Sequence, residues 1–497
     1  MDNLLFDELL QEIFLRLPPS AASAVSLVCK RWLILHRNCR SSLSLRFPSA
    51  RPFPLPAFYS FLSCYPLLSS LTVVLVPPAN STPVFADAVD CFDVAETHSS
   101  LLSDHLLLAV ASNCRHLRHL RFTPGPVSPS ALLSLSFSCE HLCSLCLSSL
   151  HPLSFRWLTS FPSLKDLSLM DCGSIYSDDT LRFDSDDYNH HHHDLVSVSF
   201  KSESELPLES LCLSGIRAGD CGIGWLWRSC TKLRRLQLRS CEGTGDGASF
   251  SSFVRCLPRL QELELRSCRT IVDGVLLRLA EYCGSLHSLL LYDGGSRDGL
   301  HSFISRCRSS LRRLDLRLPL DLDNDHLSAI SQNIRGLVSL RLQSCCLVTG
   351  QGLKTLSSAV QVGLEEFALI SCDVIETEPG LLSTLGQSLR GLRKLDLSYN
   401  EILRDKELIS MLISCKNLVD IKLRGCRGLT GAALLSMFKS CKLLETIDIK
   451  QCCRIETDTV ESFLLNSPRL RQVHIEESKL TGVAKTWVSQ KCIEIIS

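Results

Sequence analysis

LQELELRSCRTIVDGVLLRLAEYCGSLHSLLL, residues 260–291, opens with the phrase LxxLxL and returns to it at Leu286, 26 residues later. In the opening phrase apolar and polar residues alternate, which is the period of a strand with one buried face. Further on, VLLRLAEYC puts four apolar or small residues on one side of a helix, namely Leu276, Leu279, Ala280 and Cys283. One strand and one helix cannot bury their apolar faces alone, so the stretch predicts a stack of similar units.

The same phrase recurs along the chain at a nearly constant interval. Its first leucine falls at positions 208, 233, 260, 286, 311, 337, 364, 392, 418, 444 and 470, with earlier copies at 68, 117, 142 and 164. From position 208 onward the interval is 25–28 residues, and about fifteen units result. We therefore predict an α/β fold, a leucine-rich-repeat solenoid with parallel strands on its concave side and helices on its convex side.

A cysteine accompanies most copies of the phrase. CKNLVDIKLRGCRGLTG, residues 415–431, resembles the cysteine-containing subclass of leucine-rich repeats, and the resemblance extends over most of residues 64–478. Sixteen of the 26 cysteines keep the repeat's spacing: Cys64, Cys114, Cys139, Cys230, Cys256, Cys283, Cys307, Cys415 and Cys441 before the phrase, and Cys172, Cys241, Cys268, Cys345, Cys372, Cys426 and Cys452 after it. This regularity predicts free thiols that pack as small apolar groups, not disulfides.

Composition narrows the class of protein. The 497 residues include 52 basic and 52 acidic ones, and this balance predicts no bulk attraction to nucleic acid or to an anionic membrane. The longest apolar runs, such as LTVVLV from Leu71, are far shorter than the roughly 18 residues of a membrane span. The start, MDNLLFDELLQEI, lacks the basic segment of a secretory signal, so we expect an intracellular protein in the cytoplasm, the nucleus or both.

The first 45 residues do not follow the repeat. In LLFDELLQEIFLRLPPSAASAVSLVCKRWLIL, residues 4–35, one stripe of an amphipathic helix carries Leu9, Ile13 and Leu17, and the two prolines that follow end the helix. A second helix, with Ser20 as its cap, is predicted to carry Val25, Val28 and Trp32. So small a helical module has more apolar residues than it can bury, which predicts docking to another protein.

This segment resembles an F-box, whose family pattern is LPxELLxxIFxxLP followed by VCKxW. The resemblance implies a substrate-recognition adaptor that docks onto the linker Skp1, and through it onto a cullin and a RING subunit of a ubiquitin ligase. By position, the residues that would face or support the linker are Leu5, Phe6, Glu8, Leu9, Ile13, Leu17, Pro18, Val28 and Trp32. Phe6 departs from the family pattern, which usually has Pro there. The alternative is a repeat scaffold unconnected with ubiquitin, in which these helices only cap the solenoid.

These features predict four parts of the chain. They are an F-box-like module at 1–45, a linker at 46–60, the solenoid at 61–478 and a C-terminal cap at 479–497. Two departures from the spacing, near 76–100 and 174–205, are predicted to be loops. The second includes four consecutive histidines from His190, but nothing in the sequence fixes a metal geometry there.

Catalysis is not expected. The sequence has no phosphate-binding GxxxxGK[ST] loop, no GxSxG nucleophile motif and no HExxH zinc helix. The lone CxxC of Cys143 and Cys146 falls in a repeat strand, where packing is the favoured reading over zinc binding. We therefore predict no catalytic residue, no metal and no cofactor.

The concave face is where a substrate is expected. The residue after the last hydrophobe of each strand should point outward there, which gives the row Arg239, Arg266, Tyr292, Arg317, Gln343, Ile370, Ser398, Arg424 and Lys450. The neighbouring outward row is Gln237, Glu264, Leu290, Asp315, Arg341, Ala368, Asp396, Lys422 and Asp448. A ladder of mutually paired charges is favoured over an anion-binding stripe. The proposed substrate anchors are Leu290, Tyr292, Arg317 and Arg341, where apolar and basic residues adjoin.

Overall fold

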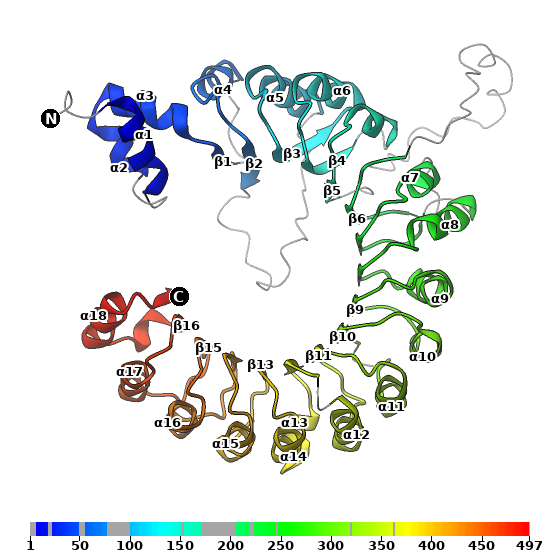
Figure 1. The fold of residues 1–497 in the computed structure, drawn as a ribbon, viewed down its shortest axis with the longest axis vertical. Coiled ribbons are helices and arrows are strands. Elements are labelled where there is room, and N and C mark those ends of the chain that lie inside the picture. The colour runs from blue at the N-terminus through cyan, green and yellow to red at the C-terminus, as the bar shows by residue number, and fades with distance from the viewer. Residues whose placement is uncertain are drawn as a thin grey trace. The chain divides into compact units, whose positions relative to one another are not determined.

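The computed structural model describes residues 6–17, 22–48, 55–76, 100–150, 154–170, 205–217, 223–244, 247–318, 321–360 and 363–496. The chain divides into two compact units, Met1–Leu257 and Pro258–Ser497. Both are built from parallel strands that alternate with helices (Figure 1). The repeat architecture predicted from the LxxLxL phrase is therefore present in each unit.

Three helices begin the first unit: α1 (Asp7–Arg16), α2 (Ala22–Val28) and α3 (Lys30–Cys39). They enclose a small core of Leu10, Phe14, Val25 and Leu35, against which Trp32 packs. The prediction of one helix carrying both Val25 and Trp32 is wrong, because Cys29 adopts extended backbone and separates α2 from α3. Its sulfur accepts a hydrogen bond from the Trp32 amide, so Cys29 caps α3. Ser20, the predicted cap, lies outside the described residues.

The sheet of the first unit contains strands β1 to β7 in chain order. Each strand pairs in parallel with the next, from β1 with β2 to β6 with β7. Its elements are β1 (Ser42–Pro48), α4 (Leu55–Leu62), β2 (Ser70–Val76), α5 (Ser100–Asn113), β3 (His119–Val127), α6 (Pro129–Ser138), β4 (Ser144–Leu150), η2 (Arg156–Ser160), β5 (Asp166–Leu169), β6 (Ser210–Ser214), α7 (Ile223–Ser229), β7 (Arg235–Arg239), α8 (Gly247–Phe253) and η3 (Val254–Cys256).

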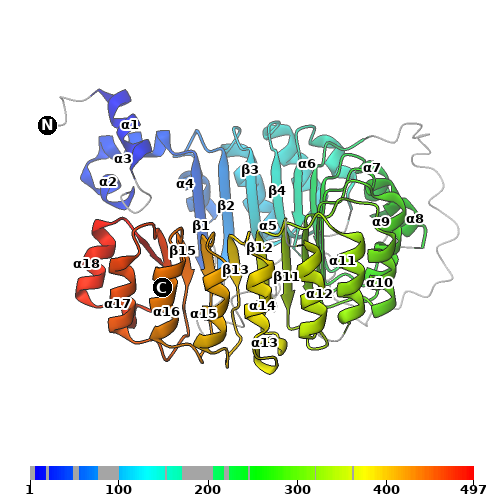
Figure 2. The same ribbon diagram turned by 60° about the horizontal axis from the view of Figure 1, so that its bottom comes forward.

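The second unit repeats the pattern with β8 to β17, again in chain order and parallel. Its strands are β8 (Glu262–Arg266), β9 (Ser288–Tyr292), β10 (Arg313–Arg317), β11 (Ser339–Gln343), β12 (Glu366–Ile370), β13 (Lys394–Asp396), β14 (Asp420–Lys422), β15 (Thr446–Asp448), β16 (Gln472–His474) and β17 (Glu494–Ile496). Its helices are α9 (Val272–Tyr282), α10 (Arg297–Arg306), α11 (Asn324–Asn333), α12 (Gly350–Val360), α13 (Val374–Thr377), α14 (Leu381–Ser388), α15 (Asp405–Ser414), α16 (Gly431–Ser440), α17 (Thr457–Asn466), η4 (Glu477–Lys479) and α18 (Gly482–Gln490). Within this unit the strands line the inner side of a curve and the helices its outer side, with α15 to α18 side by side in Figure 2.

All fifteen predicted phrases form strands, β2 to β16, and their leucines are buried. The sheet extends beyond the predicted solenoid at both ends. In the first unit β1 already pairs with β2 over Ser42 to Pro48, so the predicted linker at 46–60 contains the end of a strand and most of α4. In the second unit the predicted cap at 479–497 contains β17, which pairs with β16. The predicted loops near 76–100 and 174–205 lie almost entirely outside the described residues.

A left-handed residue ends the strand in nine repeats. These residues are Gly215, Ser240, Ser267, Asp293, Ser344, Ser371, Tyr399, Gly425 and Gln451. Such backbone is unfavourable for residues other than glycine. It is compensated here because the amide still donates to the next repeat, as from Ser344 to the Ile370 carbonyl at 2.9 Å. At position 425 a side chain is also excluded by lack of space, because a Cβ there would come within 2.7 Å of the Tyr399 ring.

In six of these nine repeats the next residue is a periodic cysteine: Cys241, Cys268, Cys345, Cys372, Cys426 or Cys452. Cys426 donates from Sγ to the carbonyl of Leu397 in the preceding repeat at 3.1 Å, and Cys452 donates to Leu423 at 3.0 Å. Asn400 occupies this position in one repeat and makes stronger bonds, from Nδ2 to the Leu369 and Leu397 carbonyls at 2.9 and 2.7 Å. Its Oδ1 also accepts from the Cys372 amide at 3.0 Å. This row therefore satisfies backbone groups that the turn leaves buried.

The predicted packing role of the periodic cysteines is confirmed for most of them. Among the sixteen, Cys64 and Cys307 are half-buried and Cys172 lies outside the described residues; all the others are buried, and every described cysteine is a free thiol.

Replacing Asn400 with Ala is expected to cost about 3 kcal/mol of unfolding free energy, because it leaves buried backbone groups without partners. Replacing Cys426 with Ala removes one weak thiol hydrogen bond and should cost only about 1 kcal/mol. Denaturant unfolding of the two variants beside the unsubstituted chain measures the difference. Equal losses would contradict the assigned role of Asn400.

Candidate partner-binding surfaces

The first candidate surface is the exposed side of α1. Leu10 and Phe14 face the core, whereas the residues at the intervening positions are exposed although they are apolar: Phe6 by 76%, Leu9 by 52%, Ile13 by 44% and Leu17 by 38%. The positions 6, 9, 13 and 17 follow the helical period, so they form one continuous stripe. We name these four residues the α1 stripe. An apolar stripe of this kind on a folded module is typical of a surface that another protein covers.

The α1 stripe is held in place by contacts on the other side of the helix. Arg31 of α3 donates to Asp7 at 2.6 and 2.9 Å, and the rings of Phe14 and Trp32 lie 5.3 Å apart. Trp32 is half-buried and packs against the core, so it supports the helix that carries the α1 stripe. Residues presented in a fixed geometry lose little conformational entropy when a partner binds.

The other predicted linker contacts divide into two groups. Glu8 and Val28 are exposed, as expected for residues that face a partner. Leu5 and Pro18 lie outside the described residues. Leu27 on α2 and Ile34 on α3, exposed by 85% and 56%, are two further apolar residues at the surface of this module that were not among the predicted contacts.

The second candidate surface is the inner face of the second unit. Two rows of side chains cross it in register, because Glu264, Leu290 and Asp315 are direct neighbours on β8, β9 and β10, as are Arg266, Tyr292 and Arg317. We name the row of Leu290 the first row and the row of Tyr292 the second row. The structure thus brings the four predicted anchors together on three adjacent strands: Leu290 and Tyr292 on β9, Arg317 on β10 and Arg341 on β11.

The arginines of both rows are already paired with acids. Arg317 donates to both oxygens of Asp315 at 3.1 Å, and Arg266 donates to Glu264 on the same strand. Arg341 lies between Asp315 at 3.8 Å and Asp396 at 3.2 Å, and Arg424 donates to Asp448 at 3.0 Å. This arrangement supports the ladder of mutually paired charges over the anion-binding stripe. Arg317 and Arg341 are consequently less suited as anchors than the sequence indicated.

Four residues of these rows are buried and do not face the solvent as predicted. They are Ala368 and Ile370 on β12, at 6% and 5% exposure, Ser398 just after β13 and Asp448 on β15, both at 6%. Arg341 on β11 reaches past β12 to Asp396 on β13, so this ion pair spans the strand that carries Ala368. A long side chain can cover a short neighbour in this way, which a row read from the sequence cannot show.

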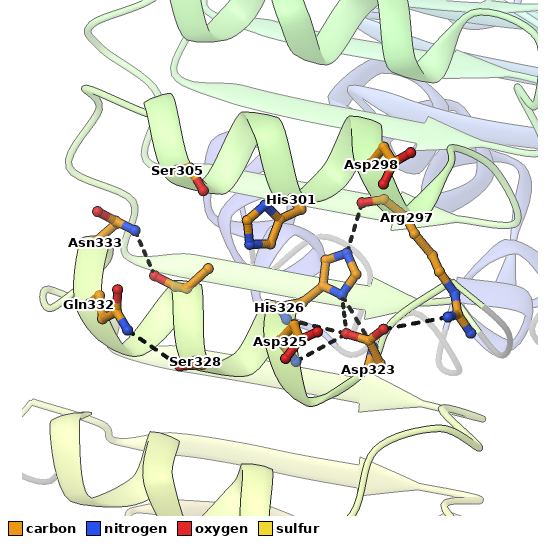
Figure 3. Close-up of a pocket in the computed structure, with 11 residues that line it drawn as sticks. Arg297, Asp298, His301, Ser305, Asp323, Asp325, His326, Ser328, Gln332 and Asn333 are labelled. Atoms are coloured by element: carbon orange, nitrogen blue, oxygen red, sulfur yellow. Dashed lines mark hydrogen bonds and ion pairs between the residues drawn. The ribbon is translucent and has the colours of Figure 1, made fainter.

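A third feature is a polar groove of about 560 Å³ between α10 and α11, lined by Arg297, Asp298, His301, Ser305, Asp323, Asp325, His326, Ser328, Ala329, Gln332 and Asn333 (Figure 3). His326 is buried, and its ring nitrogens lie 2.6 Å from Asp323 Oδ1 and 2.9 Å from the Arg297 carbonyl. Burial acts to raise the pKa of Asp323, but hydrogen bonds from the ring and amide of His326 outweigh it and lower the pKa. Asp323 thus caps α11, and His326 completes the capping box and ties α11 to α10; we assign the groove no ligand.

Within the described part of the chain, no group of three or more His, Cys, Asp or Glu side chains is placed to hold a metal ion. None of the described helices combines the length and the apolarity needed to cross a bilayer. The histidines at 190–193 lie outside the described residues.

Comparison with known proteins identifies the module that carries the first candidate surface. Residues 3–40 match the F-box domain. The match contains α1 to α3, and with them the α1 stripe. The F-box assignment made from the residue pattern is confirmed.

Solved structures with a similar course of the chain include three repeat proteins. Rad7, from a yeast complex of Rad7 and Elc1, is 17% identical with a TM-score of 0.46, and the match covers 72% of this chain and 85% of that one. TLR13, from a complex with single-stranded RNA, is 15% identical with a TM-score of 0.41, covering 73% and 53%. An internalin from Listeria monocytogenes is 15% identical with a TM-score of 0.31, covering 64% and 75%.

Proposed function

We propose that this protein is a substrate-recognition adaptor of a Skp1–cullin–F-box ubiquitin ligase. The observation that carries the proposal is the F-box match at residues 3–40, whose first helix exposes the apolar α1 stripe. The same chain continues into a repeat sheet with a second exposed surface. Two binding surfaces on one chain are what an adaptor needs.

The α1 stripe, with Glu8 and Val28 beside it, is proposed to bind a Skp1-type linker. Leu5 and Pro18 join this set by their positions in the motif, and Trp32 supports it from the core. Through the linker, the adaptor would join a cullin and a RING subunit. The regular thiol row also supports membership of the cysteine-containing repeat subclass.

The repeats are proposed to hold the protein to be ubiquitinated, with Leu290 and Tyr292 at the centre of the contact region and Arg317 and Arg341, which are paired with acids, at its rim. The adaptor then acts without a reacting group of its own. Bringing the substrate beside the ubiquitin-loaded enzyme raises the effective concentration of the two reactants and so accelerates transfer.

A pull-down with a purified Skp1-type protein tests this function. The full chain should bind, and a deletion of residues 1–40 should not; the deletion stops there because β1 begins at Ser42 and pairs with β2. The deleted protein must keep the helical and strand signal of the repeats in circular dichroism. Equal retention of the linker by both proteins would favour the alternative, a repeat scaffold unconnected with ubiquitin.

A further inference from the structure

The inner face of the second unit has an apolar interruption at β9. On β8 and β10 the first and second rows carry an acid and an arginine that bind each other, Glu264 with Arg266 and Asp315 with Arg317. On β9 the same two positions carry Leu290 and Tyr292. An apolar pair is therefore bordered on both sides by charges that already have partners.

Tyr292 differs from every other exposed large apolar residue that the structure describes. The others lie on helices, in turns or at chain segments between elements, whereas Tyr292 lies on a strand. Its side chain is 41% exposed, and Leu290 beside it is half-buried. The pair thus combines the half-buried aliphatic side chain of Leu290 with the exposed ring of Tyr292, a combination typical of the centre of a binding hot spot.

We infer that Leu290 and Tyr292 take an extended, unphosphorylated segment of the substrate, anchored by an aromatic or branched aliphatic side chain. The inference rests on the proposed adaptor function and adds the class of segment that the sheet recognises. It assigns the ion pairs of β8 and β10 to the rim of the site, where they exclude water and do not bind an anion of the partner.

Competition explains why a phosphate or carboxylate is a poor occupant. Arg317 makes two bonds to Asp315 and its side chain is only 16% exposed, so an incoming anion would have to displace a neighbour fixed on the same strand. Breaking that pair would leave the partly buried Asp315 with only the more distant Arg341, at 3.8 Å, which is costly. The lysines of the two rows, Lys422 and Lys450, lie on β14 and just after β15, five and six strands from β9.

The test uses the full chain and an array of peptides about 12 residues long, enough to cross several strands. Each peptide carries one variable centre in a common Gly, Ser and Thr background: Phe, Leu, Ile, Asn, an Asp pair or phosphoserine. We expect Phe, Leu and Ile centres to bind about tenfold more tightly than Asn, as for one buried apolar anchor. Because no ion pair with the partner is involved, affinity should change less than about twofold between roughly 50 and 300 mM salt.

Three variants locate the binding on the chain. Tyr292→Ala should lower affinity for the Phe-centred peptide about tenfold. Tyr282→Ala is the matched control, because Tyr282 is a similarly exposed tyrosine, at 48%, on the outer helix α9. The double variant Asp315→Asn with Arg317→Gln removes both charges together and should leave affinity within about threefold, as expected for a rim pair.

Preferential binding of the phosphoserine or Asp-pair peptides would overturn the inference, and so would loss of binding at the higher salt concentration. If the phosphoserine or Asp-pair peptides bound preferentially and a Lys422→Ala and Lys450→Ala double variant no longer bound them, the site for the anion would lie at β14 and β15 instead. Failure of every peptide to bind would also overturn it. Linker binding measured on the same preparations separates these outcomes from failure of the adaptor function itself.

Discussion

Replacing Leu9 and Ile13 together with Asp is expected to abolish binding of a Skp1-type linker while the chain stays folded. Both side chains are about half exposed in the free protein, so the substitutions bury no charge and should barely change stability. In the complex the two carboxylates would be enclosed without partners, at a cost of about 4 kcal/mol or more, which is about a thousandfold in affinity. Calorimetric titration of the linker into both proteins measures this loss.

The same helix supplies the control. Leu15 is 61% exposed and lies on the opposite side of α1 from the α1 stripe. Leu15→Asp therefore introduces the same chemistry outside the proposed contact and should leave linker binding nearly unchanged. Tight binding by the Leu9 and Ile13 double variant would refute the proposed surface, and equal losses in both proteins would show that the charge alone is responsible.

Alkaline pH is expected to unfold the second unit. Burial raises the pKa of five of its thiols to about 11 or 12, namely Cys345, Cys372, Cys415, Cys441 and Cys452, from an ordinary value of 9.0. A thiol whose pKa is raised on folding contributes its full stability below pH 9, and this contribution is lost as the pH rises toward the folded pKa. At pH 10 each thiol favours unfolding by about 1.4 kcal/mol, so five amount to about 7 kcal/mol, comparable with the stability of a whole domain.

Circular dichroism followed from pH 8 to pH 11 should therefore show loss of structure well below the pH at which the folded thiols themselves ionise. Tyrosine and lysine also titrate in this range, so the thiol contribution is isolated with a Cys372→Ala and Cys441→Ala double variant. That variant should be less stable at pH 7 and should lose stability more slowly above pH 9, by about 2.7 kcal/mol per pH unit. Parallel curves for the two proteins would contradict the assignment.

The sequence determined the regular parts of this protein because their signals are local. Alternation in LxxLxL identifies every one of the strands β2 to β16, and the spacing of the cysteines identifies where most thiols are buried. The motif of the first helix likewise identified the exposed positions Leu9 and Ile13. Each of these predictions depends on residues only a few positions apart. The period of a strand or helix fixes which of these residues share a face.

Features that depend on capping or on weak patterns needed the structure. The extended backbone of Cys29 divides one predicted helix into two, and Leu27 and Ile34, on either side of this break, are exposed. The strand β1 carries only a short alternating phrase at its start, yet pairing with β2 stabilises it. Local propensity is a weak guide where tertiary contacts supply most of the stability.

The charges of the inner face show the difference most clearly. The sequence places Arg317, Arg341, Asp315 and Asp396 in two outward rows, and from the rows alone a paired ladder and an anion-binding stripe are both possible. Only the tertiary structure decides, because Arg341 and Asp396 are 55 residues apart and meet by reaching past β12. Which partner a long, flexible side chain chooses depends on the distances between neighbouring strands and on the size of the residue between them, and Ala368 is small enough to let this pair form.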